Sequence, residues 1–206
     1  MQSSNGFAAG IFDLGGVLVD WNPRYLYRKL FAGDEAAMER FLTEVTTPAW
    51  NRQMDGGRPF ADAIAELQRQ HPHHAELIQA YFDRWPEMIG EVNRDTAAII
   101  RDLREAGLRV FALSDWSAET FPLARRVAAE LELFDNILIS GEARLTKPDP
   151  RLFAMACERF GVVPAETFFV DDAIANVEGA RLFGLTAIQF SDATALRATL
   201  SSLGVL

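Results

Sequence analysis

Residues 7–20 read FAAGIFDLGGVLVD, and this stretch decides the fold that we expect for the chain. Residues 7–12 are apolar apart from one glycine, which predicts a short strand covered on both faces. Asp13 follows directly and precedes a turn that contains glycine. Because ligands of open parallel sheets bind outside the carboxyl ends of the strands, we expect Asp13 to project into a crevice. Taken alone, an Asp-x-Gly-Gly sequence more often only caps a turn. Whether Asp13 belongs to a functional site therefore depends on the residues at the other strand ends.

Further short apolar runs alternate with helical patterns in the second half of the chain. This alternation predicts an α/β fold in which a parallel sheet carries helices on its faces. The further predicted strands are residues 108–113, 137–140, 167–170 and 185–190. The predicted helices are residues 93–106, 117–131, 149–160 and 173–183, and a last helix that Asp192 opens.

An insertion separates the first predicted strand from the second. About ninety residues lie between them, whereas a crossover needs roughly 12. The insertion shows helical patterns at residues 23–31, 34–45, 58–70 and 73–88, separated by helix breakers such as Pro48. We therefore expect a core formed by residues 1–20 and 93–206, and a helical cap formed by residues 21–92.

Polar residues follow the second and third predicted strands. Ser114 and Asp115 end the second strand, where a hydroxyl and backbone N–H groups could receive the oxygens of an anion. Lys147 precedes a helix that begins with proline, and beside carboxylates it would hold phosphate as a point charge. Each residue has a simpler explanation when taken alone, because Ser114 could cap a helix and Lys147 could lie on the surface.

Two adjacent carboxylates follow the fourth predicted strand, at Asp171 and Asp172. Together with Asp13 they would bring negative charge into one crevice, which is unfavourable unless a cation neutralises it. Oxygen ligands with open positions for water and phosphate suit Mg²⁺ better than Zn²⁺. The alternative is that the pair only caps the helix that follows, but the combination of four polar strand ends favours a magnesium site.

Composition excludes several classes of function. The chain has 206 residues, 24% of them charged, and a net charge of −9, without a run of Lys or Arg that would bind nucleic acid. No apolar run approaches the roughly 20 residues of a membrane span, so we expect a protein that does not enter membranes. Cys157 is the single cysteine, which favours the reducing cytoplasm, and its apolar neighbours predict a buried thiol.

These strand ends, in this order, resemble the four motifs of the haloacid dehalogenase superfamily, and the resemblance covers essentially the whole chain. The resemblance implies a Rossmann-like three-layer core with a helical cap inserted between the first and second motifs. The local sequences FDLGGVLVDW, KPDP and VDDAIANV look like the subgroup that contains bacterial glucose-1-phosphate phosphatase and the phosphatase half of soluble epoxide hydrolase. The implied activity is the Mg²⁺-dependent hydrolysis of a small phosphate monoester.

The resemblance also implies roles for single residues. By their motif positions, Asp13 would attack phosphorus, Ser114 and Lys147 would bind phosphate, and Asp171 would bind magnesium, with Asp172 as a second candidate ligand. Asp13 and the backbone carbonyl of Gly15 would be further magnesium ligands. The expected substrate contacts are Ser114, Asp115, Lys147 and Gly16.

Gly15 departs from the pattern of most phosphatases in this superfamily. They carry a second aspartate two residues after the nucleophile, which acts first as a general acid and then as a base, and glycine cannot transfer a proton. General acid–base assistance is commonly worth about 10² to 10⁴ in rate, so we expect a slow enzyme or a substrate with a good leaving group. Asp20 is one possible replacement.

Three other functions compete with a phosphatase. A 2-haloacid dehalogenase also lacks the second aspartate, but it needs no metal and carries a sequence like Ser-Ser-Asn where this chain has Asp-Asp-Ala at residues 171–173. A regulatory protein could have kept the phosphate pocket after losing the acid–base residue. A Ser-His-Asp hydrolase is disfavoured because the histidines, at positions 71, 73 and 74, all fall in the predicted cap.

The sequence leaves the substrate and the assembly open, because the substrate depends on how cap residues lie over the crevice. The candidate pocket residues are Trp21, Trp50, Arg52, Asp55 and Arg58, although both tryptophans could equally pack inside the cap. We expect a small phosphate ester as the partner molecule and either a monomer or a homodimer.

Overall fold

A five-stranded parallel sheet forms the centre of the computed structural model, which describes residues 6–206. The strands lie in the order β5-β4-β1-β6-β7. They are β1 (Ala9–Phe12), β4 (Arg109–Ser114), β5 (Asn136–Ile139), β6 (Thr167–Asp171) and β7 (Thr186–Gln189). The predicted α/β class is confirmed, and each predicted strand lies within two residues of an observed strand at both ends.

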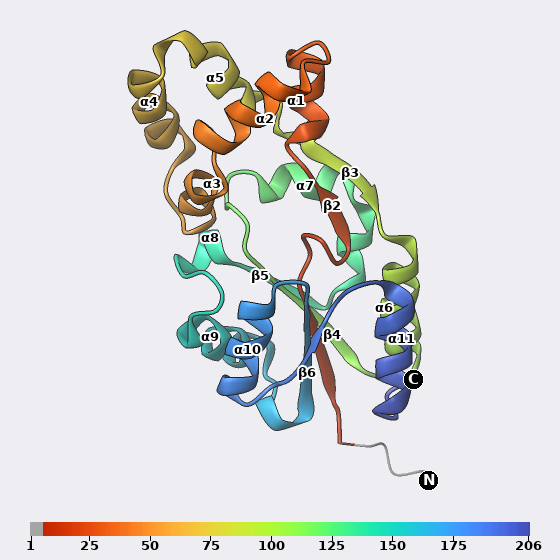
Figure 1. The fold of residues 1–206 in the computed structure, drawn as a ribbon. Coiled ribbons are helices and arrows are strands. Elements are labelled where there is room, and N and C mark those ends of the chain that lie inside the picture. The colour runs from red at the N-terminus through yellow and green to blue at the C-terminus, as the bar shows by residue number, and fades with distance from the viewer. Residues whose placement is uncertain (1–5) are drawn as a thin grey trace.

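Helices cover both faces of the sheet and make a three-layer core (Figure 1). One face packs against α6 (Arg94–Glu105), α7 (Phe121–Val127) and α11 (Ala193–Ser202). The other face packs against α9 (Pro150–Phe160) and α10 (Ile174–Phe183). Successive strand residues alternate between the faces, so Phe12 joins the first apolar layer and Ile11 joins the second.

The position of β1 in the sheet brings the predicted site residues together. Strand β1 pairs with β4 on one side and with β6 on the other, and Phe12 is in register with both Ala112 and Val170. Asp13 therefore leaves the sheet beside the end of β4, where Ser114 stands, and beside Asp171 at the end of β6.

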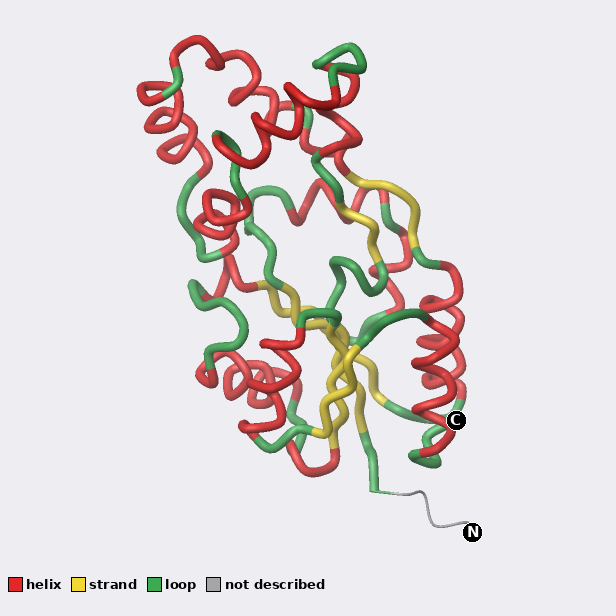
Figure 2. Tube along the Cα trace, in the orientation of Figure 1, coloured by secondary structure: helices red, strands yellow, loops and turns green. Residues whose placement is uncertain are grey.

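A second, two-stranded sheet connects the core to the inserted helices. Strand β2 (Val19–Trp21) pairs antiparallel with β3 (Ile89–Val92), and the sequence did not predict this pairing. The chain between these strands forms the helical group at the upper end of the molecule in Figure 2. We propose that residues 21–92 form the cap and that residues 6–20 and 93–206 form the core; residues 1–5, which were also predicted to belong to the core, lie outside the described residues. The inserted helices are α1 (Arg24–Leu30), α2 (Glu35–Glu44), α3 (Pro48–Asp55), α4 (Phe60–Gln70) and α5 (Ala75–Asp83).

Some predicted helix boundaries were wrong. The sequence predicted Pro48 as a helix breaker, but it opens α3, where the side chain of Thr47 accepts a hydrogen bond from the backbone N–H of Trp50 at 3.1 Å. Proline suits the first turn of a helix because no N–H partner is needed there. The helix predicted at 73–88 divides into short 3-10 helices at 72–74 and 85–88 with α5 between them.

The prediction of one continuous helix at 117–131 was also wrong. The helix α7 begins only at Phe121, and Pro122 lies in its first turn, where proline is tolerated because no N–H partner is needed. Ala128 leaves the helical backbone region, with φ of −123° and ψ of 86°, and ends α7; a 3-10 helix, η3 (Ala129–Leu133), follows it. A short helix that was not predicted, α8 (Ser140–Ala143), follows β5.

Two smaller predictions can be compared with the structure. Cys157 is buried with 7% of its surface exposed, as its apolar neighbours indicated. Among residues 6–206, no helix combines the length and the apolar character that a bilayer crossing requires.

Candidate active site

Asp13 stands at the carboxyl end of β1 with 8% of its surface exposed. One carboxylate oxygen, Oδ1, accepts hydrogen bonds from the backbone N–H of Leu14 at 2.7 Å and from the hydroxyl of Ser114 at 2.6 Å. The other oxygen, Oδ2, lies 3.0 Å from Nζ of Lys147. The side chain is therefore held from three directions in one orientation at the edge of the sheet.

Lys147 is buried and bridges two of the carboxylates. Its Nζ lies 2.6 Å from Oδ2 of Asp171 and also donates to the backbone carbonyl of Leu113 at 3.2 Å. Burial by itself would lower the pKa of Lys147, but the negative charges of Asp13, Asp171 and Asp115 raise it above its ordinary value. Lys147 is therefore a fixed positive charge within this acidic group.

The hydrogen bonds of Asp171 are made within the protein. Its Oδ1 accepts from the backbone N–H of Ala173 at 2.9 Å, and its two oxygens accept from Nδ2 of Asn176 at 3.0 and 3.1 Å. With Lys147 as a further donor, the carboxylate is held from both sides. These bonds fix the position of Asp171 at the end of β6.

Asp172 is exposed. Among the described residues, no side chain donates a hydrogen bond to its carboxylate or forms an ion pair with it. Its carboxylate lies against the backbone of Gly16, where an added Cβ would stand 2.5 Å from Oδ2 of Asp172. Gly16 also has a φ of +73°, a left-handed backbone conformation that favours glycine. The turn after β1 thus requires glycine for two separate reasons.

One ligand atom from each of Asp13, Asp171 and Asp172 falls within a group whose members are all within 4.8 Å of one another. The group carries three carboxylates and one ammonium, from Lys147, so negative charge remains in excess. An all-oxygen donor set of this kind fits a hard divalent cation such as Mg²⁺. The three carboxylates predicted from the sequence are therefore together in the fold and suited to hold a metal.

Two carboxyl groups of this cluster, those of Asp13 and Asp172, have raised pKa values. Burial raises the pKa of Asp13 to about 7, although the charge of Lys147 opposes the shift. Burial and then the charge of Asp171 raise the pKa of Asp172 above its ordinary value. A bound cation would lower both pKa values, because it favours the charged form of each carboxyl group.

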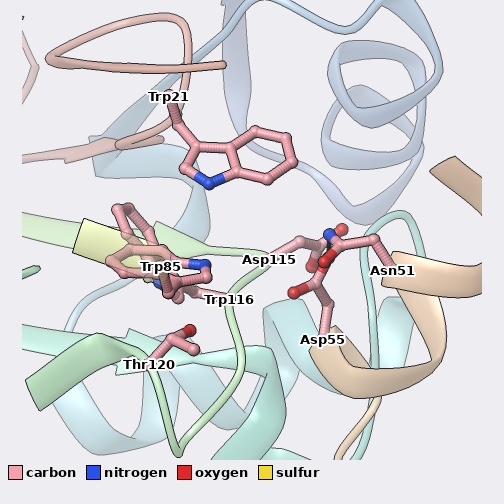
Figure 3. Close-up of a pocket in the computed structure, with 8 residues that line it drawn as sticks. Trp21, Asn51, Asp55, Trp85, Asp115, Trp116 and Thr120 are labelled. Atoms are coloured by element: carbon pink, nitrogen blue, oxygen red, sulfur yellow. Dashed lines mark hydrogen bonds between the residues drawn. The ribbon is translucent and has the colours of Figure 1, made fainter. Parts of the chain in front are cut away.

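A cavity of about 120 Å³ opens beside this group (Figure 3). Gly15 and Asp115 connect the cavity to the acidic group, because Gly15 lies two residues after Asp13 and Asp115 directly follows Ser114. In Figure 3 the aromatic residues lie on one side, and the polar residues Asn51, Asp55 and Asp115 lie together on the other. The lining residues are Gly15, Trp21, Asn51, Asp55, Trp85, Asp115, Trp116 and Thr120.

A larger cavity of about 330 Å³ adjoins the first on the side of the cap. Trp21, Asn51 and Asp55 line both cavities. These three residues therefore stand at the boundary between the cavity beside the core and the cavity beside the cap. Arg52 lines only this second cavity. A molecule that enters from the cap therefore meets Asp55 before it reaches Gly15.

The structure distinguishes among the cap residues that the sequence suggested. Trp21 and Asp55 line both cavities, whereas Trp50 and Arg58 line a separate depression on the cap. Trp50 packs instead against Phe60 and Tyr81, with ring centroids 6.3 and 5.0 Å away. The histidines lie at the end of α4 and in the adjoining 3-10 helix, in the cap.

Sequence reasoning missed four residues of the cavity. Trp116 carried a signal, because it lies two residues after the end of β4 and next to Asp115; its ring lies 5.6 Å from that of Trp85. Asn51, Trp85 and Thr120 carried none, since only tertiary packing brings them to the sheet edge. Asp20, suggested as a proton donor, is not among the lining residues of either cavity and accepts a hydrogen bond from the hydroxyl of Tyr25.

Comparison with known proteins places the chain among hydrolases of one family. The family model described as "haloacid dehalogenase-like hydrolase" matches residues 8–184. The chain is 28% identical to the sesquiterpene phosphatase astK of Aspergillus oryzae, over 92% of this chain and 92% of that protein. It is 31% identical to (S)-2-haloacid dehalogenase 4A of Burkholderia cepacia, over 58% of this chain and 52% of that protein.

The fold is also similar to solved structures. One is the HAD family enzyme bt-2542 of Bacteroides thetaiotaomicron in complex with magnesium and inorganic phosphate. It superposes with a TM-score of 0.70 at 21% identity, covering 93% of this chain and 99% of that one. At this level of identity the likeness concerns the fold.

Proposed function

The chain belongs to the haloacid dehalogenase-like hydrolase family, and from this premise we propose that it is a magnesium-dependent phosphatase of small phosphate monoesters. The observation that carries the proposal is the group formed by Asp13, Asp171 and Asp172, whose ligand atoms lie within 4.8 Å of one another. Three carboxylates beside one lysine leave an excess of negative charge that a divalent cation would neutralise. Phosphate oxygens could then approach the carboxylate of Asp13.

Asp13, Asp171 and Asp172 would hold Mg²⁺, with the backbone carbonyl of Gly15 as a further ligand. The bound ion would offset the charge of the phosphate oxygens that approach the nucleophile. Because Asp171 already accepts hydrogen bonds from Lys147, Asn176 and Ala173, Asp172 supplies the carboxylate that is freest to bind. We assign Asp171 to positioning as much as to ligation.

In the proposed reaction a carboxylate oxygen of Asp13 attacks phosphorus in line with the leaving group. The bond from phosphorus to the ester oxygen breaks, an aspartyl-phosphate forms, and the alcohol departs after gaining a proton. Water then attacks the aspartyl-phosphate and releases inorganic phosphate. Ser114 and Lys147 already lie 2.6 and 3.0 Å from the two oxygens of Asp13, where each can donate to a phosphate oxygen. Asp115 and Gly16 are further proposed contacts of the substrate.

Release of inorganic phosphate from a panel of monoesters, with and without Mg²⁺, tests this proposal. The panel should include sugar phosphates and a sesquiterpene monophosphate, because the cavity has an aromatic side and one relative is a sesquiterpene phosphatase. We expect Asp13→Asn to lower turnover at least about 10³-fold, because the nucleophile is lost. Asp62→Asn, which changes an exposed carboxylate of α4, is the matched control and should retain activity.

Phosphate release by Asp13→Asn at the rate of the unchanged protein would refute the assignment of the nucleophile. Mg²⁺-dependent binding of phosphate esters without any phosphate release would instead favour a regulatory binding protein.

A 2-haloacid dehalogenase is the second candidate, and the relative from Burkholderia cepacia favours it. In that reaction Asp13 would attack carbon and displace halide, and Gly15 is compatible with both reactions. The excess of carboxylates over cationic groups supports the phosphatase, because dehalogenases of this superfamily need no metal. Chloride release from 2-chloropropionate in the presence of EDTA would decide for the dehalogenase.

A further inference from the structure

A phosphatase of this kind needs a proton donor that the turn after β1 does not supply. The leaving alkoxide must gain a proton in the first step, and the attacking water must lose one in the second. Gly15 offers no group for either transfer. Under the proposed phosphatase function, on which this inference rests, the proton must come from another residue.

The space beside Gly15 is open. A Cβ built on Gly15 would meet no heavy atom within 4 Å, and the residue lines the cavity of about 120 Å³. The protein therefore leaves room for substrate at the point where related phosphatases place their second aspartate. A proton donor must reach this space from another wall of the cavity.

Two carboxyl groups line that cavity, and they differ in their partners. Burial raises the pKa of Asp115 above its ordinary value, but the charge of Lys147 and a hydrogen bond of 3.0 Å from the backbone N–H of Lys147 oppose that shift. Asp55 has an amide partner, since Nδ2 of Asn51 donates to its Oδ2 at 2.9 Å. Asp55 is therefore the carboxyl group better suited to keep a proton.

The surroundings of Asp55 raise its pKa on balance. Burial, and then the negative charge of Asp115, raise the pKa of Asp55 to about 8, while the charge of Arg52 and the backbone of Ser117 oppose the shift. At neutral pH the side chain is mainly a carboxylic acid, the form that a proton donor requires.

The backbone of Asp55 is also fixed relative to the core. The hydroxyl of Ser140 donates to the backbone carbonyl of Asp55 at 2.6 Å and accepts from the backbone N–H of Trp116 at 2.9 Å. One hydroxyl thus joins the end of α3 to the loop after β4. In Figure 3 the carboxyl group of Asp55 lies beside that of Asp115, facing the cavity.

We propose that Asp55, supplied by the cap, is the catalytic acid and base that replaces the aspartate missing at position 15. In the first step the O–H bond of its carboxyl group breaks and the proton passes to the leaving ester oxygen, whose bond to phosphorus breaks. In the second step the carboxylate removes a proton from the water that attacks the aspartyl-phosphate. Asp55 is then protonated again, and Asp13 is released as a carboxylate.

Two aromatic phosphate esters test the assignment. The benzyl alkoxide that leaves benzyl phosphate is strongly basic and needs a proton, whereas 4-nitrophenolate leaves 4-nitrophenyl phosphate without one. We expect Asp55→Asn to lower kcat/KM for benzyl phosphate about 10²-fold to 10⁴-fold and to change that for 4-nitrophenyl phosphate only a few-fold. Asp62→Asn, the exposed cap carboxylate, should change neither value.

The double variant Asp55→Asn with Gly15→Asp asks whether a carboxyl group from the turn can replace the one from the cap. Recovery of benzyl phosphate hydrolysis would support the assignment and show that the Asp55→Asn chain folds. Equal losses for both esters after Asp55→Asn, or no loss for benzyl phosphate, would overturn it. Absence of Mg²⁺-dependent phosphate release from both esters by the unchanged protein would instead overturn the phosphatase proposal itself.

Discussion

The side-chain hydroxyl of Ser140 donates a hydrogen bond to the backbone carbonyl of Asp55, with 2.6 Å between the two oxygens. Ser140 begins α8 in the core, and Asp55 ends α3 in the inserted helices. The contact is buried on the side of Ser140, which has 0% of its surface exposed. This hydroxyl therefore links the end of α3 to the carboxyl edge of the sheet.

Replacement of Ser140 by Ala should destabilise the protein and move Asp55. The change removes the donor to Asp55 and leaves the buried N–H of Trp116 without its acceptor, which costs about 1–3 kcal/mol. Urea unfolding measures this loss. Because Asp55 would be held less firmly, hydrolysis of benzyl phosphate should fall more than that of 4-nitrophenyl phosphate.

Ser201→Ala, which removes an exposed hydroxyl near the end of α11, is the matched control and should leave both measurements unchanged. An unfolding free energy for Ser140→Ala equal to that of the control would mean that this contact does not hold the helix in place.

Magnesium should stabilise the protein more at pH 8 than at pH 5.5. Burial raises the pKa of Asp13 to about 7 and also raises the pKa of Asp172, so protons compete with the metal at the lower pH. At pH 8 the side chain of Asp13 is mainly a carboxylate, so fewer protons compete with the ion. Since a ligand that binds only the folded state stabilises it, thermal unfolding with and without Mg²⁺ measures the difference.

Asp172→Asn should remove most of the rise in Tm that Mg²⁺ produces, because it neutralises the least engaged of the three carboxylates. A rise in Tm of the same size at both pH values would contradict the assigned ligands.

Gly16→Ala should weaken the binding of magnesium, and Gly33→Ala provides a matched comparison. Both glycines have positive φ, +73° and +90°, so each substitution strains the backbone by about 1–2 kcal/mol. Only the Cβ at position 16 meets another group, Oδ2 of Asp172 at 2.5 Å, whereas nothing lies within 4 Å at position 33. Both variants should lose similar stability in EDTA.

In calorimetric titration with Mg²⁺, only Gly16→Ala should show a weaker Kd. Equal metal affinity in the two variants would indicate that Asp172 does not bind the ion.

The sequence was sufficient to predict the residues at the edge of the sheet. Asp13, Ser114 and Asp171 each stand at or directly after the end of a short apolar run, and the carboxyl ends of parallel strands share one edge. Their places at the strand ends were therefore enough to predict that they meet, although the order of the strands in the sheet could not be predicted. Lys147 was harder to place, because the sequence cannot distinguish a lysine on the surface from one buried between two aspartates.

The cap side of the site was not predictable in the same way. Asn51 and Asp55 come from α3, a helix that the sequence did not predict because a proline such as Pro48 commonly ends a helix. Trp85 arrives from a 3-10 helix after α5. Their positions over the sheet depend on contacts between distant segments, such as the hydrogen bond of 2.8 Å from the backbone N–H of Phe60 to the carboxylate of Glu119, for which local patterns give no signal.

The antiparallel pairing of β2 with β3 has a consequence for how such a protein can change over time. Val19, where the chain leaves the core, pairs with Val92, where it returns, so both ends of the inserted segment lie next to each other. A segment with adjacent ends can be exchanged for another without altering the sheet that it interrupts. The site is thereby divided into a permanent half on the sheet and a replaceable half on the insertion, and by our proposal the replaceable half brings a proton donor along with the substrate pocket.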